Sequence, residues 1–223
     1  MKFNLAIDGP SAAGKSTIAN SLASKYHLIH LDTGAMYRAV AYQAALLSLD
    51  PSDEEAMADI AKNLPLEMTA DGRVLLDQID ISDKIRNETI SWMASVLSKH
   101  KKVRECLVAL QQKIAGKGGY VLDGRDIGTV VLPDAELKIF LTASSKARTR
   151  RRLLEYQAKG LKVSEEEIAA DIIKRDQQDS TRTNSPLKPA ADAIIIDTSD
   201  MSIEEVIAKI SSYIDERFVK DHD

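Results

Sequence analysis

The chain has 223 residues, of which 44% are hydrophobic and 29% charged, and its formal net charge at pH 7 is −4. This is the composition of a soluble globular protein, and the negative balance argues against a general nucleic-acid-binding surface. The single cysteine, Cys106, cannot form an internal disulfide. No stretch approaches the ~20 apolar residues of a membrane span. We expect a cytoplasmic, monomeric protein that binds neither membranes nor nucleic acid.

Short apolar runs alternate with longer segments of helical period along the chain. We predict strands at residues 3–7, 28–31, 120–123, 137–141 and 193–197, with helices between them, the first from Ser16 to about Tyr26. Continuous apolar strands that alternate with helices are typical of a parallel sheet covered on both faces. The sequence therefore predicts an α/β fold.

One region, residues 64–82, breaks this alternation. Its two strand-like halves surround the turn signal Ala70-Asp71-Gly72-Arg73, which indicates a hairpin. A helix precedes it, and Ser52 with Glu55 has the spacing of a capping box for that helix. We predict an antiparallel and helical insert at about 60–100 on the parallel core.

A glycine-rich segment, GPSAAGKS at 9–16, matches the phosphate-loop pattern G-x-x-x-x-G-K-[ST] at every fixed position. The glycines allow backbone N–H groups to point at phosphate oxygens, and the following helix adds its positive dipole end. Lys15 would span the β- and γ-phosphates, and the Ser16 hydroxyl would bind Mg²⁺. We therefore predict that ATP is bound by Gly9, Pro10, Ser11, Ala12, Ala13, Gly14, Lys15, Ser16 and Thr17.

The sequence lacks the signature segments of several classes of protein that bind nucleoside triphosphates. It contains no Asn/Thr-Lys-x-Asp element that would read guanine, so a switch GTPase is not favoured. Helicase and transporter ATPases are normally larger or carry other signature segments. A small kinase with a second substrate remains.

Charged residues at two further strand–helix junctions indicate where that substrate binds. The first junction, LDTGAMYR at 31–38, and the second, DGRD at 123–126, would both lie at the carboxyl ends of parallel strands. Open α/β sheets bind ligands at that edge. Arg175, Asp179 and Arg182 share one face of a later helix, a spacing that also fits a solvated, salt-bridged surface. The DGRD charges also fit a cluster that neutralises itself.

Five segments of the chain, in order and over nearly its whole length, resemble bacterial cytidylate kinase: DGPSAAGKST, LDTGAMYR, VRECLVALQQ, DGRDIGTVVLPDAELKIFL and RDQQDSTRTNSPLKPAADAIIIDT. This family belongs to the P-loop nucleoside monophosphate (NMP) kinases. The resemblance implies a five-stranded parallel sheet flanked by helices. It also implies a core at about 1–60, 100–147 and 172–223, an NMP-binding insert at about 60–100 and a short helical lid at about 148–171.

The resemblance implies a role for each charged group. Arg38 and Arg125 would bind the acceptor phosphate, as forked guanidinium groups do, and Asp123 would bind the water shell of Mg²⁺. The cytosine would be surrounded by Thr33, Ser95, Arg104, Asp126 and Arg182, the ribose would be reached by Arg175 and Asp179, and Tyr37 would complete the acceptor site. The lid arginines Arg148, Arg151 and Arg152 would close over the transferring group, although a plain surface helix also fits them.

The predicted reaction is transfer of the γ-phosphoryl group of ATP to CMP or dCMP, with no obligate general base. Thr33 stands where many relatives have serine, and the hydroxyl group is retained. Two alternatives remain open at this point. One is a P-loop kinase for another small acceptor such as UMP, AMP or shikimate, and the other is an ATP-gated binding module without transfer activity.

Overall fold

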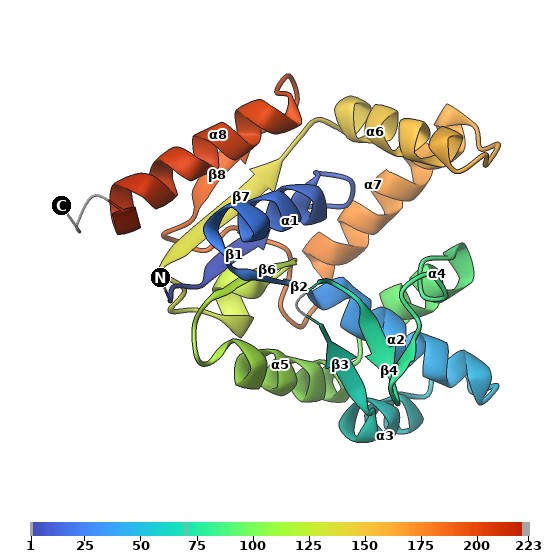
Figure 1. Cartoon of the computed structure of the whole chain (residues 1–223). Helices are drawn as coiled ribbons and strands as arrows, with labels where there is room; N and C mark the ends of the chain where they lie inside the picture. The colour runs from blue at the N-terminus through green and yellow to red at the C-terminus, as the bar shows by residue number, and fades with distance from the viewer. Residues whose placement is uncertain (1, 70, 220–223) are drawn as a thin grey trace.

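A five-stranded parallel sheet, in the order β2-β6-β1-β7-β8, forms the centre of the molecule in the computed structural model, which describes residues 2–69 and 71–219 (Figure 1). All five predicted strands are confirmed, with ends that differ by one or two residues. They are β1 (Leu5–Asp8), β2 (Ile29–Asp32), β6 (Tyr120–Gly124), β7 (Leu137–Thr142) and β8 (Ile194–Asp197).

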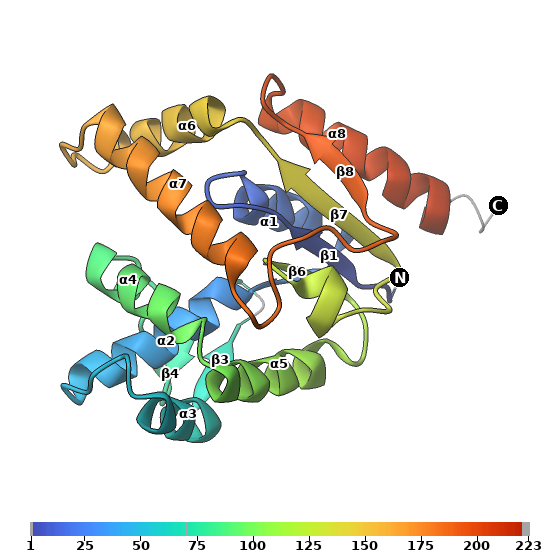
Figure 2. The same ribbon diagram turned by 180° about the vertical axis from the view of Figure 1, so that it is seen from behind.

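Period-two alternation gives the sheet two apolar faces, because successive side chains of a strand point to opposite sides. On one face Leu5 and Ile7 pack with α1 (Lys15–Tyr26) and α8 (Ile203–Ile214). On the other face Ala6 joins the core formed by α2 (Thr33–Leu46) and α5 (Lys101–Ala115). Figure 1 views the sheet from the side of α1 and α8, and Figure 2 views it from the opposite side. The predicted α/β fold is confirmed.

The insert between α2 and α5 combines two helices with a small antiparallel sheet. Its elements are α3 (Glu54–Asn63), β3 (Leu66–Met68), β4 (Val74–Leu76), β5 (Ile79–Asp80) and α4 (Glu88–Leu97). The predicted hairpin is present, with Leu66 paired to Leu76. Ala70 of its turn lies outside the described residues. The sequence did not predict the third strand, β5.

The start of α3 differs from the prediction. The N-cap is Asp53, whose side chain accepts a hydrogen bond from the Ala56 N–H at 3.1 Å. The capping box expected at Ser52 is therefore wrong by one residue. Apolar side chains of the insert, Met57 and Met93 among them, share one core with α2 and α5. The insert is therefore packed on the sheet domain and does not form a core of its own.

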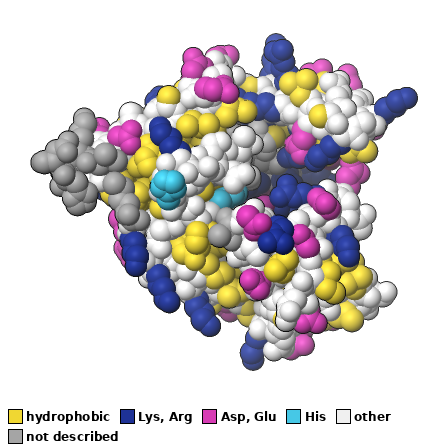
Figure 3. Space-filling view, in the orientation of Figure 1, with side chains coloured by type: hydrophobic (Ala, Val, Ile, Leu, Met, Phe, Trp, Pro, Cys, Tyr) yellow, Lys and Arg dark blue, Asp and Glu magenta, His cyan; other side chains and the backbone are white. Residues whose placement is uncertain are grey.

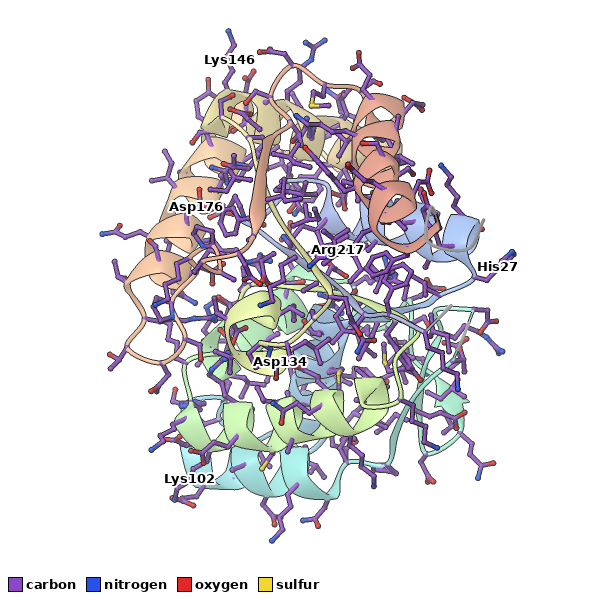
Figure 4. All side chains as sticks on the ribbon, turned by 90° about the vertical axis from the view of Figure 1, so that its left-hand side faces the viewer. His27, Lys102, Asp134, Lys146, Asp176 and Arg217 are labelled. Carbon is purple, nitrogen blue, oxygen red and sulfur yellow. The ribbon has the colours of Figure 1, made fainter. Side chains whose placement is uncertain are left out.

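Two long helices, α6 (Ser145–Ala158) and α7 (Glu165–Thr181), pack against each other and project beyond the sheet (Figure 1). Arg148 of α6 forms an ion pair with Asp176 of α7, which Figure 4 labels. Two single π-turns, η1 (Ile127–Val131) and η2 (Asp215–Val219), follow β6 and α8. Within the described residues, no helix has both the length and the apolar character that crossing a bilayer would require.

Candidate active site

A cavity of about 390 Å³ lies at the carboxyl ends of β1, β2 and β6. β1 and β6 are neighbours in the sheet, but the chain runs from β1 to β2 at one edge and from β6 to β7 toward the opposite edge. The strand ends between them therefore form a topological switch point, where α/β sheets bind ligands. Its walls come from the phosphate loop, the two predicted junctions, α4, α5, α6 and the end of α7. Figure 3 shows Lys and Arg side chains gathered at a hollow between the upper and lower halves of the molecule.

The phosphate loop presents its backbone to this cavity. Gly14 is the N-cap of α1 with a φ of +88°, a left-handed conformation that favours glycine, and no side chain caps the helix there. The first N–H groups of α1 thus remain available to an anion. Of the nine residues predicted for the loop, six line the cavity, whereas Gly9, Pro10 and Ala13 do not.

Lys15 is buried at the centre of the loop. Its Nζ donates a hydrogen bond to the Pro10 carbonyl oxygen at 2.8 Å, so the side chain folds back over the loop. Burial, and then the nearby charge of Arg125, lower the pKa of Lys15 to about 7.

Ser16 and Asp123 stand side by side on the cavity wall. The Ser16 hydroxyl donates to Asp123 Oδ2 at 2.8 Å, and His30 Nε2 lies 2.7 Å from Oδ1. A hydroxyl and a carboxylate together fit Mg²⁺, which prefers oxygen ligands and keeps several waters. Among the described residues no three His, Cys, Asp or Glu side chains form a cage. An ion here would therefore depend on phosphate oxygens and water for its remaining ligands.

His30 was not predicted as a site residue. Burial lowers the pKa of its imidazole, but the hydrogen bond and charge of Asp123 outweigh burial and hold that pKa above its usual value. The carboxylate of Asp123 is thus fixed on both oxygens. In the edge strand β2 the apolar Leu31 lies between the polar His30 and Asp32. Because alternate side chains of a strand share a face, this pattern could have predicted that His30 lies on the same face as Asp32.

On the acceptor side, buried charges surround Asp126. Arg104 donates a hydrogen bond to Asp126 Oδ2, and Arg182 Nη2 lies 3.6 Å from Oδ1. Arg104 also donates to the Tyr37 hydroxyl at 3.3 Å. Burial is the main cause that raises the pKa of Tyr37 to about 12, so the phenol stays neutral. Arg182 Nη2 is buried without a hydrogen-bond partner, which leaves a donor in the wall.

Arg125 and the residues of α7 complete this wall. Arg125 Nε donates to Asp179 Oδ2 at 2.7 Å, and only 5% of the Asp179 surface is exposed. Burial opposes ionisation, but Arg125, with smaller contributions from Arg175 and Arg182, outweighs it and lowers the pKa of Asp179. Arg175 lies beside this pair, and burial together with Arg125 lowers its pKa to about 10. Arg175 and Asp179 line the cavity from α7, and Arg182 does so from the C-cap position just beyond its end. Because Asp179 is buried there, the solvated-surface alternative is wrong for this face.

The three charged residues of the DGRD junction have different partners, and Gly124 between them is closely packed. A Cβ at Gly124 would lie 2.6 Å from Ile127 Cδ1 and 2.8 Å from Thr33 Oγ1, so a larger residue would displace both. Asp123, Arg125 and Asp126 each pair with a residue from another element, not with one another. The alternative of a self-neutralising cluster is therefore wrong. Thr33 Oγ1 donates to the Asp123 carbonyl oxygen at 2.7 Å.

Arg38 lies behind the wall rather than in it. Its Nη2 is 2.7 Å from Asp32 Oδ2, and its Nε is buried without a partner. Asp32 lines the cavity and also accepts a hydrogen bond from the Ala35 N–H at the start of α2. Asp32 engages only one of the three guanidinium nitrogens of Arg38, so the other two can still donate to a ligand, although Arg38 does not line the cavity in this conformation.

The three arginines of α6 point to different places. Arg148 is buried, pairs with Asp176, and donates to the Ser11 carbonyl oxygen at 3.2 Å. Arg151 donates to Thr198 Oγ1 at 3.0 Å, beyond the end of β8. Of the three, Arg152 is the one that lines the cavity, where it pairs with Glu155 at 3.1 Å. The plain-surface alternative is wrong for Arg148, which is buried, whereas the expectation that the lid arginines close over the transferring group stays a prediction.

Sequence reasoning also missed two charged residues, Asp8, which lies near Lys15 without lining the cavity, and Arg86, which lines it. Asp8, at the end of β1, accepts hydrogen bonds from the Ile127 and Gly128 N–H groups, both at 2.8 Å. Burial raises its pKa to about 6. An acid at the end of β1 repeats the pattern that singled out Asp32 and Asp123, so the same rule could have found it. Arg86 of the insert, an exposed cation that lines the cavity, carried no such signal.

Comparison with known proteins was made by sequence and by structure. The family model described as cytidylate kinase matches residues 5–216. A cytidylate kinase of Desulfitobacterium hafniense is 49% identical over 221 residues, covering 97% of this chain and 95% of the relative. The cytidylate kinase of Bacillus subtilis is 47% identical over 219 residues, covering 97% and 98%.

Two solved structures share the fold at low sequence identity. An uncharacterized protein from Eubacterium ventriosum has a TM-score of 0.54 and 15% identity, covering 97% of this chain and all (100%) of that one. Shikimate kinase from Bacteroides thetaiotaomicron has a TM-score of 0.51 and 12% identity, covering 96% and 99%. At these identities the likeness concerns the fold alone.

Proposed function

Because the chain belongs to the cytidylate kinase family, it is a nucleoside monophosphate kinase that phosphorylates CMP and dCMP, and we propose that the cavity transfers the group from ATP with Mg²⁺. The observation that carries this proposal is that one cavity joins two unlike sites. At one end lies a phosphate loop with Lys15, and at the other lies the buried Arg104–Asp126 pair. UMP as the acceptor and a binding module without transfer activity are not favoured.

The donor phosphates would occupy the phosphate loop. The N–H groups at the start of α1 and the Lys15 ammonium would bind the β- and γ-phosphates. Ser16 and Asp123 would hold Mg²⁺. When bound, this ion would neutralise negative charge on the phosphate oxygens. His30 fixes the orientation of the Asp123 carboxylate and so prepares the second of these ligands.

The acceptor phosphate would bind between the donor site and α7. Arg125 and Arg175 line this part of the cavity, and Arg38 would join them through the nitrogens that Asp32 does not engage. Positive charge gathered here suits two phosphate groups that must approach each other. Arg152 of α6 would add a further charge as the transferring group passes. The residues align and neutralise, and no general base is required.

The base would be recognised by its pattern of hydrogen-bond donors and acceptors. Cytosine presents an amine that donates beside ring N3 and O2 atoms that accept. Asp126 accepts only, and the guanidinium groups of Arg104 and Arg182 donate only. Uracil places an oxygen where cytosine has its amine, so the Asp126 carboxylate would repel it. Ser95 and Thr33, both on the wall, would complete the surround of the base.

The parts of the chain would then act as predicted. We assign the phosphate loop and the parallel sheet to the core, residues of about 60–100 to the NMP-binding insert, and about 148–171 to the lid. Closure of the lid would exclude water, so that ATP is not hydrolysed without an acceptor. We place this activity in a cytoplasmic monomer.

The experiment that tests the proposal measures ADP release with ATP, Mg²⁺ and a panel of acceptors: CMP, dCMP, UMP, AMP, GMP, dTMP and shikimate. We expect CMP and dCMP to give the highest kcat/KM. Omission of Mg²⁺ should abolish transfer, and omission of the acceptor should leave little ADP release. A higher kcat/KM for UMP, AMP or shikimate would overturn the assignment of the base site.

A further inference from the structure

A glutamine of α7 reaches across to the insert beside the base site. Gln178 Nε2 donates a hydrogen bond to Ser95 Oγ at 2.7 Å and another to the Ser95 carbonyl oxygen at 3.0 Å. Both side chains are half-buried. In the part of the chain that the structure describes, no other hydrogen bond or ion pair joins α4 to α7. Gln178 is therefore the polar tie between the insert and the helix that carries Arg175 and Asp179.

The partners of Gln178 determine which of its amide atoms faces Ser95. A backbone carbonyl oxygen can only accept, so the amide nitrogen of Gln178, not its oxygen, must face Ser95. The same nitrogen then donates to Ser95 Oγ as well. The Ser95 hydroxyl proton is not used inside the protein, since no hydrogen bond donated by Ser95 Oγ occurs among residues 2–69 and 71–219. Ser95 lines the cavity, so this proton is available to an acceptor atom of a ligand.

The opposite polarity is fixed on the other side of the base site. Thr33 Oγ1 donates its own proton to the Asp123 carbonyl oxygen, which can only accept. Thr33 thus offers a ligand only its oxygen lone pairs. The Ser95 hydroxyl is therefore oriented to donate to a ligand, and the Thr33 hydroxyl is oriented to accept from one. In each case a backbone carbonyl oxygen, which can only accept, determines the direction of the hydrogen bond. Such a pair suits a base edge that carries both a donor and acceptors.

We propose that Gln178 is a positioning residue for the acceptor nucleotide, which holds α4 against α7 and directs the Ser95 hydroxyl proton into the cavity. This inference rests on the proposed function, because it assumes that the acceptor base binds beside Ser95. Without the tie, the bound nucleotide would have to order α4 and Ser95 itself, and binding would weaken. The loss would fall equally on the ground state and the transition state, so KM would rise while kcat stays nearly constant.

The kinetic test uses Gln178→Glu, which keeps the shape but replaces the donor by a second acceptor. We expect KM for CMP to rise roughly three- to tenfold, the range for the loss of neutral hydrogen bonds, with kcat within about twofold and KM for ATP unchanged. The matched control is Gln177→Glu, the same change of charge at an exposed neighbour outside the cavity. Equal KM values for CMP in the two variants, or a parallel rise of KM for ATP, would overturn the proposal.

A second readout needs no catalysis. Trp92, the single tryptophan, lies on α4 three residues before Ser95 and is exposed. In nucleotide-free protein, loss of the tie should lower the fluorescence anisotropy of Trp92 in Gln178→Glu but not in Gln177→Glu. Unchanged anisotropy in both would overturn the tie, whereas failure of the wild type to phosphorylate CMP would concern the proposed function instead. If Gln178→Glu does not fold by thermal melt, Gln178→Met removes the donor without adding charge and is subject to the same criteria.

Discussion

Arg125 and Asp179 form an ion pair in the cavity, with Arg125 Nε 2.7 Å from Asp179 Oδ2. The pair links the end of β6 to α7. Asp179 therefore has two functions to serve, because the carboxylate expected to contact the sugar also orients the guanidinium expected to bind the phosphate. Substitution at Asp179 should be felt at both ends of the acceptor nucleotide.

Asp179→Asn should lower kcat/KM for CMP and for dCMP alike by roughly ten- to a hundredfold, the range for a lost charge-assisted hydrogen bond. The shared effect follows because Arg125 loses the partner that orients it. The measurement is kcat/KM for both nucleotides, with Asp171→Asn on the exposed side of α7 as the control. A loss for CMP with no change for dCMP would show that Asp179 acts on the 2′-hydroxyl and not through Arg125.

Asp126→Ala should lower kcat/KM for CMP by roughly ten- to a hundredfold and that for UMP much less, so the CMP/UMP ratio should fall. Arg104 and Arg182 would be left buried without the carboxylate, and the melting temperature should fall too. The kcat/KM values for CMP and UMP are therefore measured at a temperature below the thermal unfolding of the variant. An equal loss for the two nucleotides would show that Asp126 orients Arg104 and does not read the base.

Lys15→Met should lower kcat by roughly 10³-fold or more, because the charge at the β- and γ-phosphates is lost. The fold should be retained, since Lys15 is buried at a cost that depresses its pKa and Met has a similar length. Exposed Lys113 on α5 provides the control variant Lys113→Met. A folded Lys15→Met protein within tenfold of the wild type would contradict the role of this residue.

ATP binding should take up a proton above pH 7. The Lys15 pKa of about 7 in the nucleotide-free protein means that most Lys15 is neutral at pH 8, and an adjacent triphosphate must raise this pKa. Uptake should approach about one proton near pH 8 and fall toward zero below pH 6. Calorimetric titration in two buffers of different ionisation enthalpy measures it. Lys15→Met should bind ATP more weakly and without this uptake; the same uptake in that variant would assign the proton elsewhere.

The parallel sheet was predictable because its strands are continuous apolar runs between helices. Strand β5 was not, since Ile79 and Asp80 are both exposed and a two-residue strand leaves no periodic signal. The cap of α3 was misplaced because Ser52 and Asp53 are both good capping residues. Only the backbone conformation decides between such neighbours.

The phosphate loop and the strand-end charges were also predictable, because motif spacing and topology place them together. Their pairing was not. Nothing in the chain order indicates that Arg38 is held by Asp32, that Arg148 is buried against Ser11, or that His30 holds Asp123. These contacts join segments distant in sequence, except Arg38 with Asp32, and a buried charge chooses its partner through three-dimensional packing.

The order of the strands has a consequence for how the molecule folds. β1 is synthesised first, but its sheet neighbours are β6 and β7, so Leu5 pairs with Val121 and Leu137. Contacts of such long range form late, because the closure of a long loop costs entropy before any pairing compensates for it. The insert packs through elements close in sequence, α2 with α4 and α3 with α5, and can organise earlier. During translation, therefore, a nascent chain that ends before β7 already contains the phosphate-loop sequence but lacks the strand pairing that shapes it into a site.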